Sequence, residues 1–204
     1  MSKTILAVLS ILVLIIVAVG GFYVWKMFSA PKATLVVPPA AEDTRSTYAT
    51  STYSIKYPGN FSANSGYAYD QFGPKKLIQG VKFLIPGTMA TGTNLSASDT
   101  GISVEQLPNA KKCTGDIYLT ANVTARNLTE NGTDYSFASS SGVAAGNFYE
   151  EEVYALATST PCTAVRYFIH SANIGNYEPG TAQEYDRSAL MSAFDKIRAS
   201  LVLN

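Results

Sequence analysis

The pattern of apolar and polar residues divides the chain into three parts, of which the first is a long apolar run. The run from Ile5 to Trp25 contains no charged side chain and a single serine, Ser10. A helix of this length spans roughly 32 Å, close to the ~30 Å thickness of the apolar part of a bilayer. A cleaved signal peptide has a shorter apolar run that ends at small residues, whereas this run ends at bulky aromatic ones. The pattern predicts an uncleaved transmembrane anchor within residues 1–28.

The second part, residues 29–52, shows no hydrophobic periodicity. It contains Pro31, Pro38 and Pro39 among alanine, threonine and serine. Proline favours the extended polyproline form and stiffens such a segment. We therefore predict a flexible linker over residues 29–52 that holds the following domain clear of the membrane surface.

The third part, residues 53–204, alternates apolar and polar residues in short segments that end at proline or glycine, as is typical of β-strands. Asn131-Gly132 lies between two such segments and is the strongest hairpin signal in the chain, because a type I′ turn needs positive φ at both central residues. Another pair of segments flanks Thr158 to Pro161. The predicted strands are 53–58, 80–85, 102–107, 123–130, 133–138, 149–157 and 162–170, and a weaker signal indicates a short helix over 109–119.

The last predicted element is a helix over residues 187–198. Leu190, Phe194 and Ile197 recur at helical spacing, and Asp186 stands where an N-terminal capping residue is expected. The apolar face of this helix is expected to lie across the sheet. The predicted fold class is therefore α+β, with an N-terminal transmembrane helix followed by an antiparallel sheet of about six or seven strands packed with a C-terminal amphipathic helix.

Both ends of the predicted domain resemble a known family. Segment 53–61, Tyr-Ser-Ile-Lys-Tyr-Pro-Gly-Asn-Phe, is similar to the start of PsbP-like domains, and segment 194–201 resembles their final helix, which runs directly into a short last strand. Segments 146–150 and 167–171 look more like uncharacterised membrane-anchored bacterial proteins. The resemblance implies a Mog1/PsbP-like sandwich over residues 53–204. It also implies a non-catalytic binding or subunit role, and it assigns a function to no residue of this chain.

Charge narrows the class of partner. The chain has 15 basic and 15 acidic residues, and residues 33–204 carry 12 basic and 15 acidic ones, a net charge of about −3. A surface that binds nucleic acid needs an excess of basic residues to neutralise the phosphates. The composition therefore predicts no nucleic-acid partner.

The two cysteines bear on the compartment. Cys113 and Cys162 both fall in the predicted domain and are expected to form a disulfide if that domain lies where thiols are not kept reduced. Lysines flank the apolar run on both sides, so flank charge alone leaves the orientation open. The cysteines and the Ser/Thr/Asn/Gly-rich composition favour a single-pass protein of the cell membrane with its domain outside the cytoplasm.

Candidate chemistry is sparse. His170 is the only histidine, so a nucleophile–histidine–acid hydrolase would have to use it, yet no Gly-x-Ser-x-Gly motif is present and residues 139–142 (Ser-Ser-Ser-Gly) have loop composition. One histidine also argues against zinc or copper. The three consecutive glutamates from Glu150 to Glu152 place too few oxygens on one side of a strand for calcium. No catalytic residue, metal site or cofactor is predicted.

The last predicted hairpin brings three polar residues together. If Ala157 stands opposite Cys162, the alternation of side chains along strands puts Glu151, Arg166 and His170 on one face. We expect an ion pair between Glu151 and Arg166, which contributes at most about 1 kcal/mol if it is exposed.

An aromatic loop is the best candidate for a binding surface. Tyr67, Tyr69 and Phe72 suit recognition because aromatic side chains gather at interfaces, and they equally suit a cap over the core. The sequence as a whole predicts a membrane-anchored extracytoplasmic binding or assembly module without catalytic activity, with a protein or envelope partner. The alternative is a cell-envelope hydrolase that uses His170.

Overall fold

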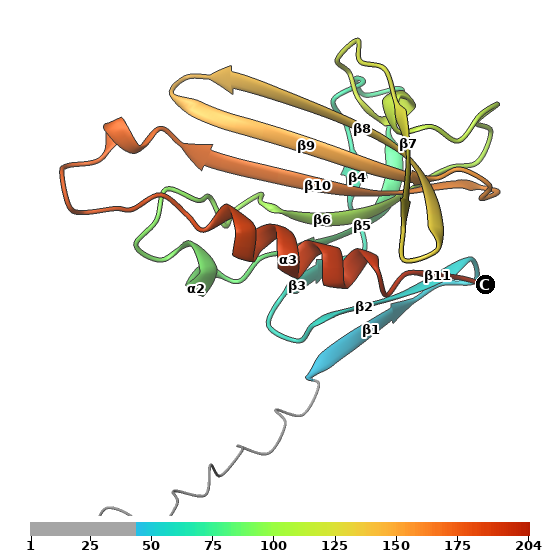
Figure 1. The fold of residues 1–204 in the computed structure, drawn as a ribbon, viewed down its shortest axis with the longest axis horizontal. Helices are drawn as coiled ribbons and strands as arrows, with labels where there is room; N and C mark the ends of the chain where they lie inside the picture. Colours follow the sequence, from blue (N-terminus) through green and yellow to red (C-terminus); the bar gives the residue numbers. More distant parts are fainter. Residues whose placement is uncertain (1–43) are drawn as a thin grey trace, which may run out of the picture. The chain divides into compact units, whose positions relative to one another are not determined.

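The structure, a computed structural model, describes residues 44–204, which form a large sheet, a small sheet and one helix longer than four residues (Figure 1). The strands are β1 Arg45–Ala49, β2 Tyr53–Pro58, β3 Ser62–Asn64, β4 Ala68–Tyr69, β5 Ile78–Leu84, β6 Gly101–Leu107, β7 Arg126–Glu130, β8 Thr133–Ala144, β9 Asn147–Leu156, β10 Cys162–Ala172 and β11 Val202–Leu203. The helices are α2 Gly87–Ala90, α3 Arg187–Arg198 and the short 3-10 turns η1 Gly115–Tyr118 and η2 Ile174–Asn176.

Both sheets are antiparallel. The small sheet has the strand order β1-β2-β11, and the eight-stranded large sheet has the order β3-β5-β6-β10-β9-β8-β7, with β4 paired to β5. The centre of the large sheet is thus formed by β6, β10 and β9. Figure 1 shows α3 crossing this sheet beside the small sheet.

The larger hydrophobic core lies between one face of the large sheet, here called the helix face, and the layer of α3 and the small sheet. Leu190, Phe194 and Ile197 of α3 are buried against it, as their spacing predicted. The side chain of Asp186 accepts a hydrogen bond from the backbone N–H of Ala189 at 2.9 Å, which confirms the predicted N-terminal cap.

A second, smaller core lies on the opposite face of the large sheet, here called the loop face, which carries the even-numbered side chains of β10. Small residues of β8, β9 and β10 form its floor. Tyr69 of β4, Tyr118 of η1 and Leu119 are buried over that floor. These covering residues come from the short elements β4 and η1 and from the residue that follows η1, and not from long strands or helices.

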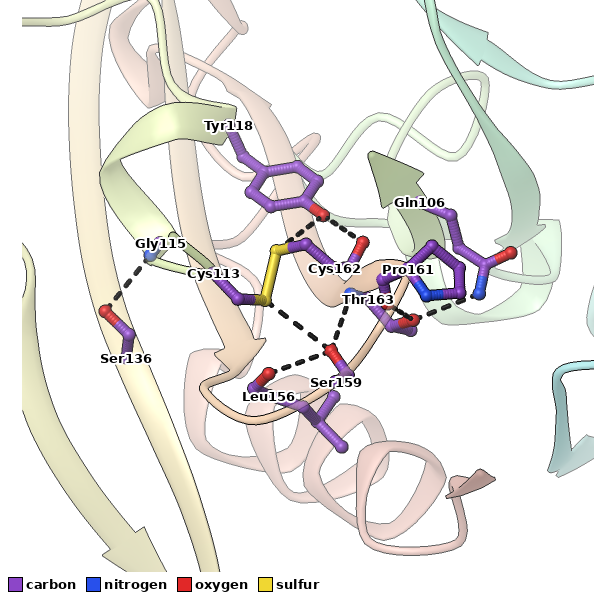
Figure 2. The surroundings of a disulfide bond; sticks show 10 residues. All are labelled: Gln106, Cys113, Gly115, Tyr118, Ser136, Leu156, Ser159, Pro161, Cys162 and Thr163. Atoms are coloured by element: carbon purple, nitrogen blue, oxygen red, sulfur yellow. Dashed lines mark hydrogen bonds between the residues drawn. A yellow bond between two sulfur atoms is a disulfide. The ribbon is translucent and has the colours of Figure 1, made fainter. Parts of the chain in front are cut away.

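The disulfide between Cys113 and Cys162 ties this cover to the sheet (Figure 2). The two Cα atoms are 5.1 Å apart and 49 positions apart in the sequence, so the predicted bridge is confirmed. The hydroxyl of Tyr118 donates to the carbonyl oxygen of Cys162 at 2.7 Å, and the backbone N–H of Gly115 donates to Oγ of Ser136 at 3.2 Å. The segment around η1 is therefore fixed to β8 and β10 by one covalent and several polar contacts.

Two tight turns set the lengths of β7, β8 and β9. Asn131 and Gly132 have φ values of 51° and 79°, which confirms the predicted hairpin turn. Ala145 and Gly146, with φ values of 49° and 77°, form a second turn between β8 and β9. β8 therefore runs on to Ala144, beyond the predicted end at 138, because its serine-rich half is paired with β9 along its whole length.

Several predictions of the fold are wrong. The described residues form eleven strands and the fold is mainly β, not an α+β sandwich of six or seven strands. Segment 109–119 is helical only over the 3-10 helix η1, Gly115–Tyr118, so the short helix predicted there is too long. The linker predicted over 29–52 extends too far, because β1 pairs with β2; the signal of β1 is weak since Tyr48 is its only large apolar residue.

The transmembrane helix predicted over residues 5–25 lies outside the described residues. Within residues 44–204, no helix has the length and apolar character needed to cross a bilayer. The start of the predicted linker, up to residue 43, also lies outside the described part of the chain.

Replacing Cys113 and Cys162 together by alanine is expected to lower the free energy of unfolding. In the chain-entropy model, a bridge that closes a loop of this length contributes roughly 4 kcal/mol, and measured values are commonly smaller. Urea unfolding of the full chain in detergent measures the difference. Reductant should lower the unfolding midpoint of the wild-type protein and leave that of the double variant unchanged. An unchanged wild-type midpoint after complete reduction would contradict a stabilising role.

Candidate functional site

The loop face of the large sheet carries the polar and aromatic residues from which a site is built. Side chains alternate along a strand, so Arg166, Phe168 and His170 of β10 all project from this face. The antiparallel register places Ser103 of β6 beside Arg166 on one side and Val153 of β9 on the other. The sheet itself therefore determines which side chains meet.

Arg166 and Glu105 form an ion pair at the centre of this face. Nε and Nη2 of Arg166 donate to the two carboxylate oxygens of Glu105, each at 2.8 Å, and Nη2 also donates to the backbone carbonyl of Tyr118 at 2.7 Å. The exposed fractions of the two residues are 1% and 0%. This bidentate pair is fully enclosed, so its stability rests on direct contacts and not on water.

Three further groups complete this ionic centre, which we define as Arg166, Glu105, Glu151, Ser103 and Tyr69. Nη1 of Arg166 donates to Oε2 of Glu151, and Oγ of Ser103 donates to Glu105 at 2.7 Å. The ring of Tyr69 lies 3.6 Å from the guanidinium of Arg166, a cation–π contact. The hydroxyl of Tyr69 donates to Glu151 at 3.3 Å.

Burial and charge act in opposite directions on the ionisable groups of this face. Burial alone lowers the pKa of Arg166, but the carboxylates of Glu105 and Glu151 outweigh it and raise that pKa above its ordinary value. Burial raises the pKa of Tyr69, which therefore stays a neutral donor. Burial lowers the pKa of Lys82 on β5, although the carboxylates of Asp99 and Glu105 oppose this shift.

A row of aromatic side chains continues from the ionic centre toward the far ends of the strands. We define this aromatic row as Tyr149, Phe168 and His170, all of which are partly exposed. Tyr149 stacks on His170 with ring centroids 4.5 Å apart and an interplanar angle of 24°. Nζ of Lys82 lies 4.7 Å from the centroid of the Phe168 ring, so a cation borders the row.

His170 is oriented by a carboxylate. Its Nδ1 lies 2.8 Å from Oδ2 of Asp99, and the side chain of His170 is 18% exposed. Nε2 is buried and has no hydrogen-bond partner among residues 44–204. The nearby hydroxyl of Ser96 donates to Asp99 at 2.8 Å. The geometry thus has the acid–histidine part of a catalytic triad, while the Ser96 hydroxyl bonds the carboxylate instead of the imidazole.

The structure has the predicted hairpin register, in which Val153 stands opposite Arg166 and Tyr149 opposite His170. Glu151 and Arg166 pair as predicted, and the pair is not exposed, because the loop face is covered at that point. His170 lies on the same face and pairs with Asp99 instead of joining the ionic centre.

The aromatic loop predicted as a binding surface, Tyr67, Tyr69 and Phe72, is not part of the aromatic row. Tyr69 is only 4% exposed, and Tyr67 and Phe72 are partly buried and pack against the second core. The sequence left open whether these residues form a recognition surface or a cap over the core. Tyr69 belongs to a cap over the second core. The ring of Phe72 packs edge-on against Tyr69, with centroids 5.8 Å apart.

Glu150 and Glu152 project from the helix face, opposite to Glu151. Nη2 of Arg187 at the start of α3 donates to Glu150 at 2.8 Å and to Glu152 at 3.1 Å. The glutamate triplet therefore joins α3 to β9. Within residues 44–204, no group of three or more histidine, cysteine, aspartate or glutamate side chains is arranged to hold a metal ion.

Sequence reasoning missed Glu105, Asp99, Lys82 and Tyr149. Glu105 lies on an alternating strand, where a charged residue on the polar side indicates exposure and not burial. Its partner Arg166 is 61 positions away, and only the pairing of β6 with β10 brings the two together. No feature of the sequence near Glu105 or Arg166 predicts that the two residues pair.

Replacing Arg166 by methionine is expected to destabilise the domain by about 3–5 kcal/mol, because it leaves the buried carboxylate of Glu105 without its counter-ion. Adding Glu105→Gln to that variant should recover part of the loss, since the uncompensated charge is removed. Urea unfolding of the two single variants and the double variant forms a double-mutant cycle. Additive losses would show that the pair is not coupled.

Comparison with known proteins assigns no family. No family model matches the chain, and no curated protein matches it. A crystal structure of a protein from Bacteroides thetaiotaomicron VPI-5482 is similar to the chain with a TM-score of 0.40 and 11% sequence identity. The alignment covers 74% of this chain and 45% of that one, so the chain spans less than half of that protein's length. The resemblance to PsbP-like domains stays a prediction.

Proposed function

We propose that this protein is a binding or assembly module that acts outside the cytoplasm, held at the membrane by the apolar segment 5–25, and that it contacts a protein of the envelope through the aromatic row. The observation that carries this proposal is the row itself, three partly exposed rings on one sheet face, of which Tyr149 packs against both Phe168 and His170. Aromatic residues are enriched at interfaces because they bury large areas at little cost in conformational entropy.

Neighbouring contacts hold the side chains of the aromatic row in fixed positions, as a binding surface requires. Phe168 lies on β10 only two residues from Arg166, and Tyr149 lies on β9 two residues from Glu151, so the ionic centre holds both strands in register. Asp99 fixes the orientation of His170, on which Tyr149 stacks. Side chains that are already ordered lose little entropy when a partner covers them.

The disulfide supports the proposed compartment. Both cysteines of the chain are used in one bridge, and such bridges persist where thiols are not kept reduced. The apolar segment 5–25 supports attachment to a membrane, because its length matches the apolar thickness of a bilayer.

The rival function is a hydrolase that uses His170. The contact between Nδ1 of His170 and Asp99 favours it, because a carboxylate in this position orients the imidazole of hydrolase triads. A nucleophile must also reach Nε2, and within residues 44–204 no hydroxyl is bonded to that atom. Binding through the aromatic row therefore has the better support.

A photoreactive benzoylphenylalanine in place of Phe168 is expected to give a discrete cross-linked product with a partner in intact cells. The matched control carries the same group in place of Val202, which is 58% exposed on the small sheet. Products at neither position, or the same products at both, would contradict recognition by the aromatic row.

Phe168→Ala should lower the affinity for the cross-linked partner roughly 30-fold, the effect of a hot spot worth about 2 kcal/mol. Binding titration against that partner measures the change, and thermal unfolding checks that the variant stays folded. His170→Gln separates the two functions, because loss of a hydrolytic activity with the partner still bound would favour the rival.

A further inference from the structure

The outer edge of β8 lacks a neighbouring strand over half of its length. β9 pairs with β8 from Tyr135 to Ala144, whereas β7 pairs only with residues 133–137. Among the described residues, no backbone hydrogen bond other than those to β9 is made by residues 139–144. In Figure 1 the far ends of β8 and β9 extend beyond the short strand β7. Residues 139–144 thus present one row of free backbone N–H and C=O groups.

This open edge has none of the features that normally protect an edge strand. Its sequence is Ser-Ser-Ser-Gly-Val-Ala, without a charged residue or a proline. Its register with β9 is continuous, so no bulge turns it away. Natural edges usually carry lysine, proline or a bulge because free strand edges pair with other chains. An edge that is uncharged, straight and open is suited to receive a strand.

A cavity of about 770 Å³ lies directly beside this edge on the helix-face side. Val143, Phe148, Ile174 and Tyr185 supply apolar walls, and Val143 and Phe148 are 70% and 40% exposed. A strand added along β8 places every second side chain on this side of the sheet. Its backbone would pair with β8 while its alternate side chains enter the cavity, as in other cases of strand addition.

The charges at the cavity indicate the kind of side chain that fits. Glu150 and Glu184 both line it, and Glu150 is paired with Arg187. Glu184 is exposed and forms no ion pair within residues 44–204. Two carboxylates against one guanidinium leave the cavity acidic, so a basic side chain is complementary to it.

We propose that residues 139–144 of β8 receive an extended segment of another protein as an added strand, with apolar side chains at alternate positions and one basic side chain in the adjacent cavity. The free N–H and C=O groups require an extended backbone and not a helix or a small molecule. A second copy of this chain fits less well. Residues 139–144 of a second copy contain no basic side chain that could enter the acidic cavity. This surface adjoins the aromatic row, because Tyr149 also lines the cavity. The proposal rests on the free backbone groups of residues 139–144 and stands without the function proposed for that row.

The test uses the full chain in detergent and a synthetic heptapeptide, acetylated and amidated, that alternates threonine with valine and carries one lysine. Hydrogen exchange of residues 139–144 is measured by mass spectrometry with and without this peptide. At about ten times the Kd, outward-facing amides are expected to exchange roughly tenfold more slowly. The control peptide is N-methylated at alternate amides, which keeps its side chains and removes its strand hydrogen bonds.

A variant pair completes the design. A Cβ at Gly142 meets no atom within 4 Å, so Gly142→Lys keeps the fold and places a charge on the edge; it should abolish protection. Gly87→Lys adds the same charge at another glycine whose Cβ would meet no atom within 4 Å, and it should leave the protection by the peptide unchanged. Absence of protection, or equal protection by the N-methylated peptide, would overturn strand addition. Protection before any peptide is added, lost in Gly142→Lys together with a dimer, would show a second copy on the edge and overturn the peptide proposal.

Discussion

The ion pair between Arg166 and Glu105 is the interaction on which the rest of the loop face depends. Two charges with exposed fractions of 1% and 0% lose nearly all of their hydration on folding. Such a pair is stable only when direct contacts replace that hydration. Ser103, Glu151, Tyr69 and the carbonyl of Tyr118 supply those contacts, so four separate segments must meet at one guanidinium. The pair therefore requires the register of β6, β10 and β9.

The cover over this pair explains the position of the disulfide. β4 and η1 contribute Tyr69 and Tyr118, but neither element is long enough to be stable without support. The bridge from Cys113 to Cys162, together with the hydrogen bond from Tyr118 to the carbonyl of Cys162, holds η1 on the sheet. Without that cover water would reach Arg166, and the close contacts of the ionic centre would weaken. The disulfide thus helps to keep water away from the ion pair between Arg166 and Glu105.

The main core and the proposed binding features occupy different parts of the long strands. On the helix face, α3 covers the middle of the sheet and packs against the main core. Arg187, in the first turn of α3, forms ion pairs with Glu150 and Glu152 of β9. Beyond that turn the long strands β8, β9 and β10 continue without a helix over them, as Figure 1 shows. The aromatic row and the open edge of β8 both lie on these extended strands. Where the strands of a rigid sheet extend beyond the helix that covers them, ordered side chains and backbone groups stay exposed. Such groups are suited to binding.

The sequence by itself determined the local elements. The strand at 53–58, the hairpin at Asn131-Gly132, the helix 187–198 with its Asp186 cap and the pairing of β9 with β10 all follow from spacing and turn chemistry over short distances. The disulfide followed from the count of cysteines. Only the tertiary structure decided the burial of Arg166, its pairing with Glu105, the contact of His170 with Asp99 and the strand character of residues 139–144. The first three depend on which distant segments become neighbours, and a polar residue on an alternating strand has the same pattern whether water or another segment covers it. Residues 139–144 form a strand because β9 pairs with them after the turn at Ala145 and Gly146, although their serine-rich sequence is typical of a loop.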